Sequence, residues 1–459
     1  MRKIWDPMEF SLETRKKDLG TLAGRYFDVL IIGGGIAGAG VASILAANGL
    51  DVILVDRADF ASGTSSNSSK LIHGGIRYLG QGHVMVTMDL LRERNYLMKN
   101  TDFVKGIDFD ILIDDRSWRR YTIAAGLLFY NLLGRNYSIP RFHKGKYSYP
   151  GFKGHYTYMD AVTDDAQLVI YNVITAKMLG AMTLNYVAAE KIIKENGMNR
   201  VTLRDTMFGG EYSVKCKVIV NSTGPWVGET YAKYSGKDMN GFKLSKGSHL
   251  IMKKDHFPFG NAVAFKSHID GRQMFVIPRN ETVIIGTTDD FVTSPDSLKV
   301  TDEEKDYIYE SVKRLFPALD RSDIIGTYVG IRPLYGKGND PGRVTRDFHI
   351  DVTGKMVSVM GVKITNYRTA SRKVAATVGK VLGRKMRTSD LPQILYRRRE
   401  EGDRIDLAIN EECALTVEDI LKRRLGYFYF KADQGKGIRD EITKRIKAKV
   451  DNLNKTNVI

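Results

Sequence analysis

The feature that most constrains the fold is a run near the start of the chain, residues 27–56, which reads FDVLIIGGGIAGAGVASILAANGLDVILVD. Every residue of Val29–Ile32 is apolar, which predicts a buried strand. Small and aliphatic residues predict a helix over Ile36–Ala47. Val52–Val55 then predicts a second strand, which ends at the acid Asp56. A strand, a glycine-rich turn, a helix and a second strand with a terminal acid are typical of a dinucleotide-binding unit.

Three glycines in this run, Gly33, Gly35 and Gly38, follow the pattern G-x-G-x-x-G. The first permits a tight turn, the second lets backbone approach a pyrophosphate, and the third lets the helix pack closely on the strand. The pyrophosphate is expected at the helix N-terminus, where unpaired N–H groups favour an anion. We expect Asp56 to accept hydrogen bonds from the adenosine ribose, and its charge argues against a 2′-phosphate and hence against NADP. An ordinary glycine-rich turn is the alternative interpretation, and the complete pattern disfavours it.

Length and composition are those of a soluble globular protein with two or three domains, at 459 residues with 43% hydrophobic and 27% charged residues. The two cysteines, Cys216 and Cys413, have no metal-ligand spacing and indicate a reducing compartment. Residues 1–25 are mixed in charge, which argues against a secretory signal. The longest apolar stretch, Tyr121–Leu133, is too short to cross a membrane and is predicted to be a buried helix.

The formal net charge of +17 is compatible with nucleic acid, an anionic membrane surface or an anionic substrate. The basic residues are spread along the chain, densest near the C-terminus, and they lack the aromatic interleaving of a nucleic-acid-binding segment. A membrane surface or an anionic substrate is therefore favoured, with a generic basic surface as the alternative.

Residues 58–80 form a segment rich in Ser, Gly and Thr, ADFASGTSSNSSKLIHGGIRYLG. As plain structure it would be a mobile loop. Its other use is to present many N–H groups and hydroxyls to a long polar ligand, as a flavin buried end to end requires. Lys70, His73, Arg77 and Tyr78 follow within nine residues, and each would otherwise be a surface side chain.

Two later segments repeat the arrangement of a strand followed by a small-residue turn. The strand Tyr212–Val220 runs into Thr223-Gly224, and a strand pattern over Val344–Val359 precedes Gly361 and a helix, which places a second helix dipole near the ligand. Between them, residues 245–290 alternate with strand character, which predicts an antiparallel sheet inserted into the nucleotide domain.

Several separated blocks resemble, in order and spacing, the FAD-dependent glycerol-3-phosphate dehydrogenases. They read GTSSNSSKLIHGGIRYL, NSTGPWV, LSKGSHLI, FVIP-x-x-x-x-x-IIGTTD, GIRPL and GVKITNYR. The similarity runs from Phe27 to Arg372 and resumes over Glu411–Leu425. It is most specific in SSKLIHGG-x-RY, a pattern that few other flavoproteins share.

The chain departs from the family in two places. The glycine-turn block has Val362 and Asn366 where relatives usually carry Gly and Thr. The segment between Asp390 and Glu411 is much shorter than in the family, so roughly half of the helical cap is expected to be missing. In relatives that region helps to form the dimer and the membrane-facing body, so a separate anchor subunit is a reasonable hypothesis.

The resemblance implies the fold of the amino-acid-oxidase class of flavoproteins. This is an α/β fold, with a Rossmann-like FAD-binding domain, an inserted mainly antiparallel β-sheet substrate domain and a short helical C-terminal tail. The expected division is an N-terminal extension 1–25, FAD-binding segments 26–105, 161–244 and 344–389, substrate-domain segments 106–160 and 245–343, and a truncated helical region 390–459.

The resemblance also implies an activity and its residues. The expected reaction is oxidation of sn-glycerol 3-phosphate to dihydroxyacetone phosphate by hydride transfer to FAD, with electrons passed to membrane quinone. Arg77 and Arg332 are the implied substrate clamps and His249 the base, although a lone histidine in a strand is often structural. The other implied catalytic groups are Lys363 at the flavin edge, Tyr78 and Thr365. The implied FAD-binding residues are Gly33, Gly34, Gly35, Ile36, Gly38, Asp56, Arg57, Thr64, Ser65, Ser66, Ser69, Lys70, Leu71, His73, Gly74, Gly75, Val187, Thr223, Gly224, Trp226, Gly361, Lys363, Ile364 and Thr365.

Three other functions stay open at this point: an oxygen-using glycerol-3-phosphate oxidase, an amine or amino-acid oxidase of the same fold, and a basic flavin-bearing scaffold without catalysis. The expected partners are glycerol 3-phosphate, quinone and a second copy of the chain, with no metal and no nucleic acid. The expected location is the cytoplasm, peripheral on the inner face of the cell membrane. In the last helix Ile438, Ile442, Ile446 and Val450 form a stripe that we expect to pack on the protein's own body.

Overall fold

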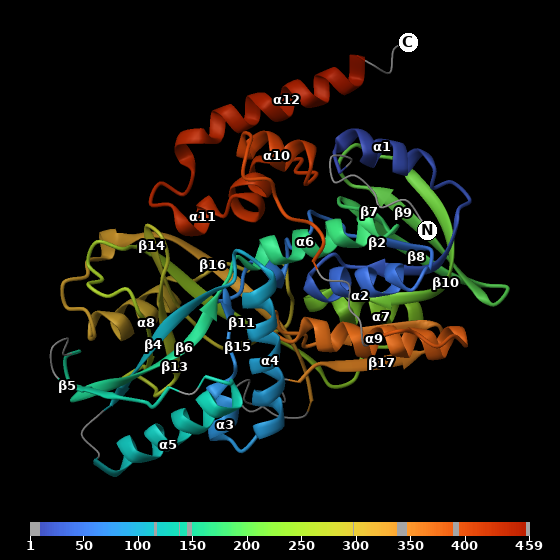
Figure 1. Cartoon of the computed structure of the whole chain (residues 1–459). Coiled ribbons are helices and arrows are strands. Elements are labelled where there is room, and N and C mark those ends of the chain that lie inside the picture. Colours follow the sequence, from blue (N-terminus) through green and yellow to red (C-terminus); the bar gives the residue numbers. More distant parts are fainter. Residues whose placement is uncertain are drawn as a thin grey trace.

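The computed structural model describes residues 10–113, 117–136, 138–144, 149–296, 298–336, 347–388 and 394–455. Two sheets lie side by side, the nucleotide sheet on the right of Figure 1 and a second sheet on the left. This arrangement confirms the predicted fold class, an α/β domain with an inserted, mainly antiparallel sheet.

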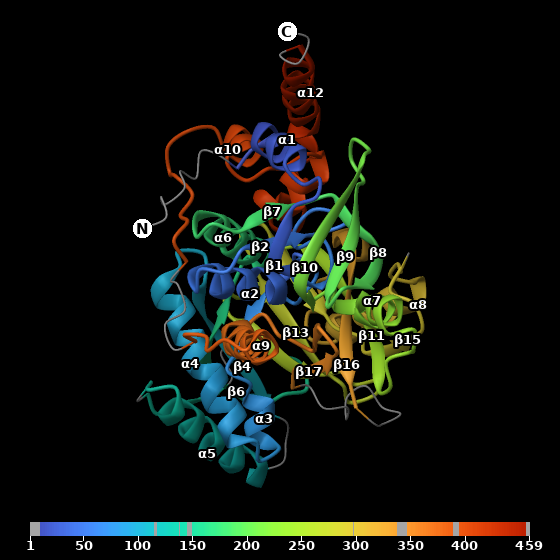
Figure 2. The same cartoon turned by 90° about the vertical axis from the view of Figure 1, so that its right-hand side faces the viewer.

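The nucleotide sheet has parallel strands at its centre, in the order β17-β18-β10-β1-β2-β7. Its strands are β1 Tyr26–Ile32, β2 Val52–Val55, β7 Met182–Leu184, β8 Val187–Glu195, β9 Met198–Asp205, β10 Glu211–Asn221, β17 His349–Thr353 and β18 Met356–Met360. Helices α2 Ile36–Ala47, α6 Asp165–Met178 and α9 Tyr367–Leu382 pack on one face, and the β8–β9 hairpin and α7 Val227–Ser235 on the other (Figure 2). Burial on both faces explains why Val29–Ile32 of β1 and all of β2 are apolar.

The second sheet follows the order β15-β11-β14-β13-β12-β4-β6-β3, with β16 paired to β11 and β5 paired to β6. Its strands are β3 Leu71–Ile72, β4 Lys105–Ile113, β5 Phe142–Lys144, β6 Gly154–Val162, β11 Phe242–Lys253, β12 Ala262–Lys266, β13 Gln273–Pro278, β14 Thr282–Gly286, β15 Asp290–Val292 and β16 Ile324–Tyr335. Two distant stretches of chain join in this sheet because β4 pairs in parallel with β12.

Helices cover both faces of the second sheet. Helix α8, Asp302–Lys313, packs on one face with Ile308 and Val312. On the other face lie α3 Ile76–Gly80, α4 Val84–Asn100 and α5 Ser117–Leu133. The helix predicted over 121–133 is present, but the expectation that it is buried is wrong, because one face of α5 exposes large apolar side chains.

Two details of the strands position residues near the cavity. The block GIRPL, Gly330–Leu334, lies within the continuous strand β16, so Arg332 is held on a strand. Strands β7 and β8 are separated by only two residues. The residues between β7 and β8 form a turn that contains Tyr186, with a positive φ of 54°.

The C-terminal region packs against the nucleotide domain through buried charge. Asp59 accepts hydrogen bonds from Arg423 and from both terminal nitrogens of Arg424 at 2.7–3.0 Å. This region contains α10 Arg404–Asn410, α11 Tyr427–Phe430 and α12 Arg439–Lys455, and α12 lies at one end of the molecule beside α1 Leu12–Gly20 (Figure 2).

The apolar stripe of α12 faces inward as predicted. Ile442 is fully buried, and Ile438, Ile446 and Val450 are partly buried against the body of the protein. Among the described residues, none of the helices combines the length and apolar character needed to cross a bilayer.

Candidate nucleotide and substrate site

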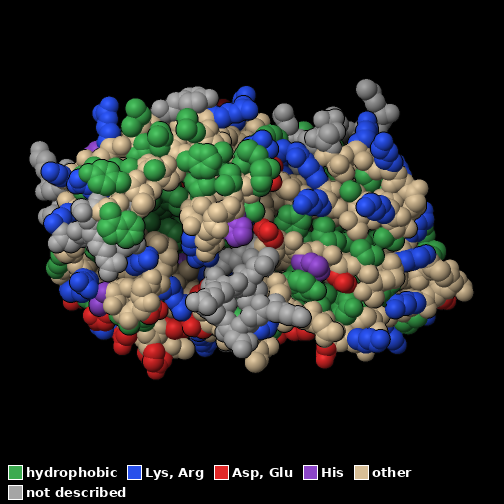
Figure 3. Space-filling view, turned by 90° about the horizontal axis from the view of Figure 1, so that it is seen from below, with side chains coloured by type: hydrophobic (Ala, Val, Ile, Leu, Met, Phe, Trp, Pro, Cys, Tyr) green, Lys and Arg blue, Asp and Glu red, His purple; other side chains and the backbone are tan. Residues whose placement is uncertain are grey.

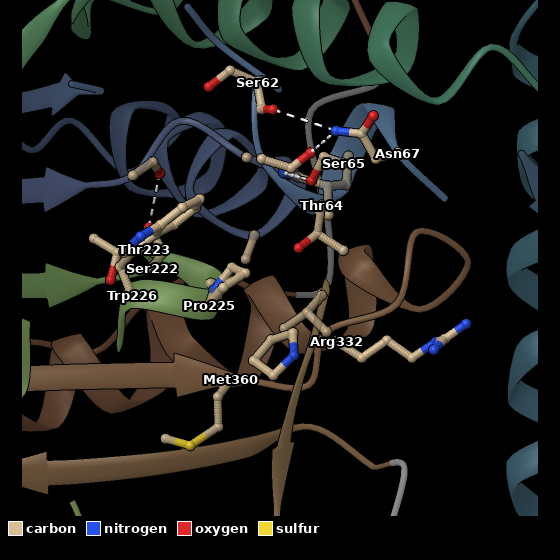
Figure 4. A pocket seen from close by; sticks show the side chains of 18 of the residues that line it. Ser62, Thr64, Ser65, Asn67, Ser222, Thr223, Pro225, Trp226, Arg332 and Met360 are labelled. Atoms are coloured by element: carbon tan, nitrogen blue, oxygen red, sulfur yellow. Dashed lines mark hydrogen bonds between the residues drawn. The ribbon is translucent and has the colours of Figure 1, made fainter. Parts of the chain in front are cut away.

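A cavity of about 860 Å³ runs between the two sheets. Turns after β1, β10 and β18 line it, together with the Ser-rich segment 62–69 and the strands β11 and β16 (Figure 4). The parallel strands all present their carboxyl ends to this cavity, which is where α/β sheets bind ligands.

The first turn has the geometry that the glycine pattern predicts. Gly33 has φ +104°, and a Cβ there would lie 2.5 Å from the carbonyl oxygen of Ser222. A Cβ at Gly38 would lie 2.0 Å from the carbonyl oxygen of Gly33, so only glycine lets α2 pack this closely. The N-terminus of α2, capped at Gly35, therefore faces the cavity, where its dipole favours an anion.

Asp56 closes this turn from the end of β2. Its Oδ2 accepts the Gly34 N–H at 2.7 Å and its Oδ1 accepts the Ala58 N–H at 3.0 Å. Burial raises the pKa of Asp56 to about 6, against the opposing effect of these two hydrogen bonds. The carboxylate lines the cavity, so its remaining acceptor capacity is directed at a ligand.

The Ser-rich segment is ordered by its own side chains. Ser65 Oγ accepts the Ile36 N–H at 3.1 Å, Thr64 Oγ1 donates to the Ile331 carbonyl at 2.6 Å, and Asn67 Nδ2 donates to the Gly63 carbonyl at 2.8 Å. Figure 4 shows Ser62, Thr64, Ser65 and Asn67 close together beside the first turn. The interpretation of this segment as a mobile loop is therefore wrong.

A second helix N-terminus reaches the cavity from α9. Residues 361–365 precede this helix, and Asn366 holds them through a hydrogen bond from the Lys363 N–H at 2.9 Å. The Lys363 ammonium lies 4.3 Å from the centroid of the Tyr78 ring. It is buried, and among the described residues no hydrogen-bond acceptor reaches it. The two departures from the family thus have local roles, Asn366 in this turn and Val362 in packing against the core.

His249 lies on β11 between the cavity and the core. Its ring stacks on Tyr328 with centroids 4.5 Å apart, and Nε2 is 2.9 Å from Ser69 Oγ. Burial, with the positive charges of Arg332 and Lys70, lowers the pKa of His249 to about 3. A histidine ordinarily titrates near neutral pH, but in this environment His249 does not, and its ring is neutral at pH 7.

Arg332 projects from β16 into the cavity with 26% of its side chain exposed. Nη1 lies 3.3 Å from Asp289 Oδ1 and Nη2 donates to Thr287 Oγ1 at 3.2 Å. Figure 4 shows the side chain extending away from Met360 and from the Thr223 turn. The guanidinium is thus oriented by Thr287 and Asp289, which follow β14, on the side of the cavity away from Thr223.

The cavity brings together most of the residues expected there. Those that line it are Gly33, Gly35, Ile36, Asp56, Arg57, Thr64, Ser65, Ser69, Leu71, His73, Tyr78, Val187, Thr223, Gly224, Trp226, His249, Arg332, Gly361, Lys363, Ile364 and Thr365. They come from turns and strands of the nucleotide sheet, from the stretch between Thr64 and Tyr78, and from β11 and β16 of the second sheet.

Seven expected residues do not line the cavity: Gly34, Gly38, Ser66, Lys70, Gly74, Gly75 and Arg77. Gly34, Gly38, Gly74 and Gly75 are needed for close packing instead, as at Gly74, where a Cβ would lie 2.2 Å from Tyr130 Oη. Lys70 is fully buried, donating to Asp165 Oδ1 at 2.6 Å and to the Ser66 carbonyl at 2.7 Å. Arg77 is exposed on α3.

Sequence reasoning missed other lining residues. Phe275 and Thr287 lie in the blocks FVIP and IIGTTD, so the resemblance of these blocks to the family was a signal that could have found them. Ala188, Glu190 and Arg204 belong to the β8–β9 hairpin and line one end of the cavity. No local signal marks them, because their place depends on how the hairpin folds over the sheet.

The cavity has the features that FAD requires. Two helix N-termini and a glycine cradle suit the pyrophosphate, and an ordered polar segment runs along the length between them. His249 Nδ1 and Lys363 Nζ are buried polar atoms without a hydrogen-bond partner among the described residues, as expected where a polar ligand completes the site.

Comparison with known proteins agrees with this geometry. The family described as DAO, FAD dependent oxidoreductase, matches residues 28–361. An aerobic glycerol-3-phosphate dehydrogenase of Staphylococcus epidermidis is 33% identical over 396 residues, which are 81% of this chain and 71% of the relative. A Staphylococcus aureus protein of the same name is 33% identical over 78% of this chain and 67% of the relative.

Solved structures share the fold. The glycerol-3-phosphate dehydrogenase from Bacillus halodurans, complexed with FAD, superposes with a TM-score of 0.77 at 24% identity, over 95% of this chain and 94% of that one. The L-alpha-glycerophosphate oxidase from Mycoplasma pneumoniae gives a TM-score of 0.63 at 18% identity, over 82% and 99%. The chain therefore belongs to the FAD-dependent oxidoreductases and, within them, to the FAD-dependent glycerol-3-phosphate dehydrogenase family.

Proposed function

We propose that this protein oxidises sn-glycerol 3-phosphate to dihydroxyacetone phosphate and passes the electrons to a membrane quinone. The observation that carries the proposal is the pair of cations, Arg332 and Lys363, on the wall of the same cavity that the nucleotide-binding turns line. A phosphorylated polyol needs such charge, and an amine substrate would be repelled by it. The Staphylococcus relatives, whose name is aerobic glycerol-3-phosphate dehydrogenase, support the same substrate.

When bound, FAD supplies the hydride acceptor for a secondary alcohol. The residues proposed to hold it are the α2 turn at the pyrophosphate, Asp56 at the ribose, the Ser-rich segment along its length and the turn 361–365 near the ring. Lys363 would place a positive charge beside this ring, where it favours a gain of negative charge.

Arg332 is the residue proposed to bind the substrate phosphate. Its planar fork donates two parallel hydrogen bonds to an oxyanion, and Asp289 and Thr287 hold it in one orientation. The Arg332 guanidinium must therefore contact Asp289 and the substrate phosphate at the same time. The Arg77 clamp is not retained in the proposal, because the side chain is exposed on α3 away from the cavity lining.

His249 is proposed to take the hydroxyl proton from the substrate. Being neutral at pH 7, it is in the form that can accept a proton. Part of its low pKa comes from the charge of Arg332, and a bound phosphate dianion would offset that charge. Substrate binding is therefore expected to raise the pKa of His249 and so to make it a stronger base. Tyr78 and Thr365 line the same region and are proposed as hydrogen-bond donors to the substrate.

The test is anaerobic addition of glycerol 3-phosphate to the purified, FAD-loaded protein, followed by the absorbance near 450 nm, the usual band of oxidised flavin. Rapid bleaching with glycerol 3-phosphate, with much slower bleaching by glycerol and none by glycine or proline, supports the proposal. Bleaching with an amino acid alone would replace it. Quinone reduction is then compared with peroxide release in air, and peroxide as the main product would identify an oxidase.

A further inference from the structure

Helix α5 has an unusual exposed face. Trp118 and Tyr121 are more than 60% exposed, and Leu128, Phe129 and Leu132 are 41–48% exposed. Their spacing places these residues on one side of the helix, so they form one stripe that spans about 21 Å from Trp118 to Leu132. The opposite face is also apolar, with Leu127 and Tyr130 buried against the second sheet. A helix that is apolar all round is normally buried or lies in a membrane.

We term this stripe the α5 face. The stretch of chain that carries it is positively charged. Residues 117–144 contain five Lys or Arg and no Asp or Glu. Of these, Arg120 is half-buried beside Tyr121, while Arg135, Arg141 and Lys144 are exposed. Ile139, in the same stretch, is 76% exposed, and Met85 at the start of α4 is 65% exposed.

Figure 3, the view from below Figure 1, shows this side of the molecule. Hydrophobic side chains gather over the region where α5 lies, and Lys and Arg side chains stand at their margin. An apolar centre with aromatic residues and a cationic rim is the pattern of a surface that lies in the headgroup layer of a bilayer.

We propose that the α5 face docks on an anionic lipid bilayer, with Trp118, Phe129 and Leu132 entering the headgroup layer. The positive charge near the α5 face favours an anionic bilayer over a second copy of the chain. A second copy would place the same patch opposite itself across a two-fold axis, so arginines would face arginines around the contact. An anionic lipid surface instead attracts each exposed Lys or Arg near it.

The docked helix is rigidly joined to the cavity. Tyr130, on the buried face of α5, donates to Asp160 Oδ2 at 3.0 Å, and the same carboxylate accepts the Gly74 N–H at 2.9 Å. Gly74 follows His73, which lines the cavity. Docking through α5 therefore holds the cavity at a fixed distance from the bilayer. The docking surface rests on the proposed function in one respect, because it supplies the membrane contact that quinone reduction needs. Lipid binding itself does not require the reaction.

The experiment uses the FAD-loaded full chain and sedimentation with vesicles of phosphatidylglycerol or of phosphatidylcholine. We expect binding to phosphatidylglycerol, at least tenfold weaker binding to phosphatidylcholine, and weakening by salt. Phe129→Glu, which puts a charge in the middle of the α5 face, should reduce phosphatidylglycerol binding more than tenfold. Phe208→Glu is the matched control, because Phe208 is 53% exposed in the β9–β10 turn of the other sheet, and it should bind as wild type.

Trp118 provides a direct signal that does not depend on a destabilised variant. Its emission should shift to shorter wavelength with phosphatidylglycerol vesicles, and Trp118→Phe identifies its share of the signal. Absence of wild-type binding, or equal binding of Phe129→Glu, would overturn the proposal. The sedimentation coefficient is also measured without lipid. If it were lower for Phe129→Glu than for wild type, the α5 face would bind a second copy of the chain, and the proposal would be overturned.

Flavin bleaching by glycerol 3-phosphate, measured on the same preparations in detergent, separates the two proposals. Bleaching without vesicle binding refutes only the docking surface. Vesicle binding without bleaching refutes only the proposed reaction.

Discussion

The hydroxyl of Tyr429 donates a hydrogen bond to Asn67 Oδ1 over 3.1 Å, which joins the C-terminal region to the segment that lines the cavity. The Tyr429 ring also lies 3.6 Å from the Lys70 ammonium, and its carbonyl accepts a hydrogen bond from Thr282 of β14 at 2.6 Å. One residue of the C-terminal region therefore contacts both the Ser-rich segment and the second sheet. Through these contacts the C-terminal region braces the cavity.

Tyr429→Phe tests this brace, because it removes the hydrogen bond to Asn67 and keeps the ring over Lys70. Loss of one partly buried hydrogen bond costs about 0.5–1.5 kcal/mol, so FAD should dissociate roughly two- to tenfold more readily. FAD release during dilution, followed by flavin fluorescence, gives the measurement. Tyr427→Phe in the same helix is the control, and equal FAD retention in both variants would mean that Asn67 does not depend on the C-terminal region.

The parts of the site that could be predicted from the sequence are those determined locally. Gly33, Gly35 and Gly38 act through the backbone of a single turn, and Asp56 follows directly from the end of β2. Lys70 and Arg77 do not line the cavity, because side-chain direction in this part of the chain depends on partners far along the sequence, such as Asp165 for Lys70. The fold class was predictable because the spacing of apolar residues in strands and helices is a local property. Insertion of one domain into another does not change it.

Helix α5 shows why burial is harder to predict than secondary structure. Its apolar run correctly predicts a helix, but an apolar residue can face either the core or the protein surface. The same difficulty applies to Val362 and Asn366, where the chain departs from the family. Their effect depends on the turn before α9 and on the core beneath it.

Lys70→Met should destabilise the protein rather than selectively weaken FAD binding. The change leaves the Asp165 carboxylate buried beside Ser68 without its cation, which costs about 3–5 kcal/mol in comparable buried pairs. Thermal denaturation of the FAD-free protein gives the measurement. Lys70→Met combined with Asp165→Asn should recover part of the loss. If Lys70→Met kept wild-type stability but lost FAD, Lys70 would be a cofactor ligand after all.

His249 makes the stability of the FAD-free protein dependent on pH. Its folded-state pKa of about 3 lies below the ordinary value of 6.5, so the unfolded chain binds a proton over a range where the native protein does not. Stability from this residue is therefore fully present above about pH 7 and falls as the pH drops, by about 2 kcal/mol at pH 5. Urea denaturation of wild type and His249→Gln at pH 5 and pH 8 tests this, and an equal change in both proteins would assign the dependence to other groups.

FAD binding should strengthen as the pH rises through about 6. The pKa of Asp56 is raised to about 6 in the FAD-free protein, and ribose hydroxyls donate better to the ionised carboxylate. If only the ionised form binds well, the Kd for FAD should fall by up to about tenfold between pH 5 and pH 7. Asp56→Asn should remove most of this dependence. Titration of flavin fluorescence with apoprotein at each pH gives both curves, and parallel curves would exclude Asp56 as the ribose acceptor.

Arg332→Ala tests the phosphate site directly. A charge-assisted hydrogen bond contributes about 1.5–3 kcal/mol, so KM for glycerol 3-phosphate should rise roughly 10- to 100-fold with FAD still bound. Arg332→Lys should lie between, because it keeps the charge but loses the fork that Asp289 and Thr287 orient. Arg272→Ala is a matched control, a similarly exposed arginine in a turn of the second sheet.

The reaction of glycerol itself distinguishes phosphate binding from a general loss of activity in Arg332→Ala. Glycerol has no group for Arg332 to bind, so its slow bleaching of the flavin should be equal in wild type and Arg332→Ala. If Arg332→Ala impaired both substrates alike, the guanidinium would act on the flavin or on His249, whose low pKa it helps to set. Inorganic phosphate should compete with substrate in wild type and lose that effect in Arg332→Ala, because it needs the same fork and no reaction at all.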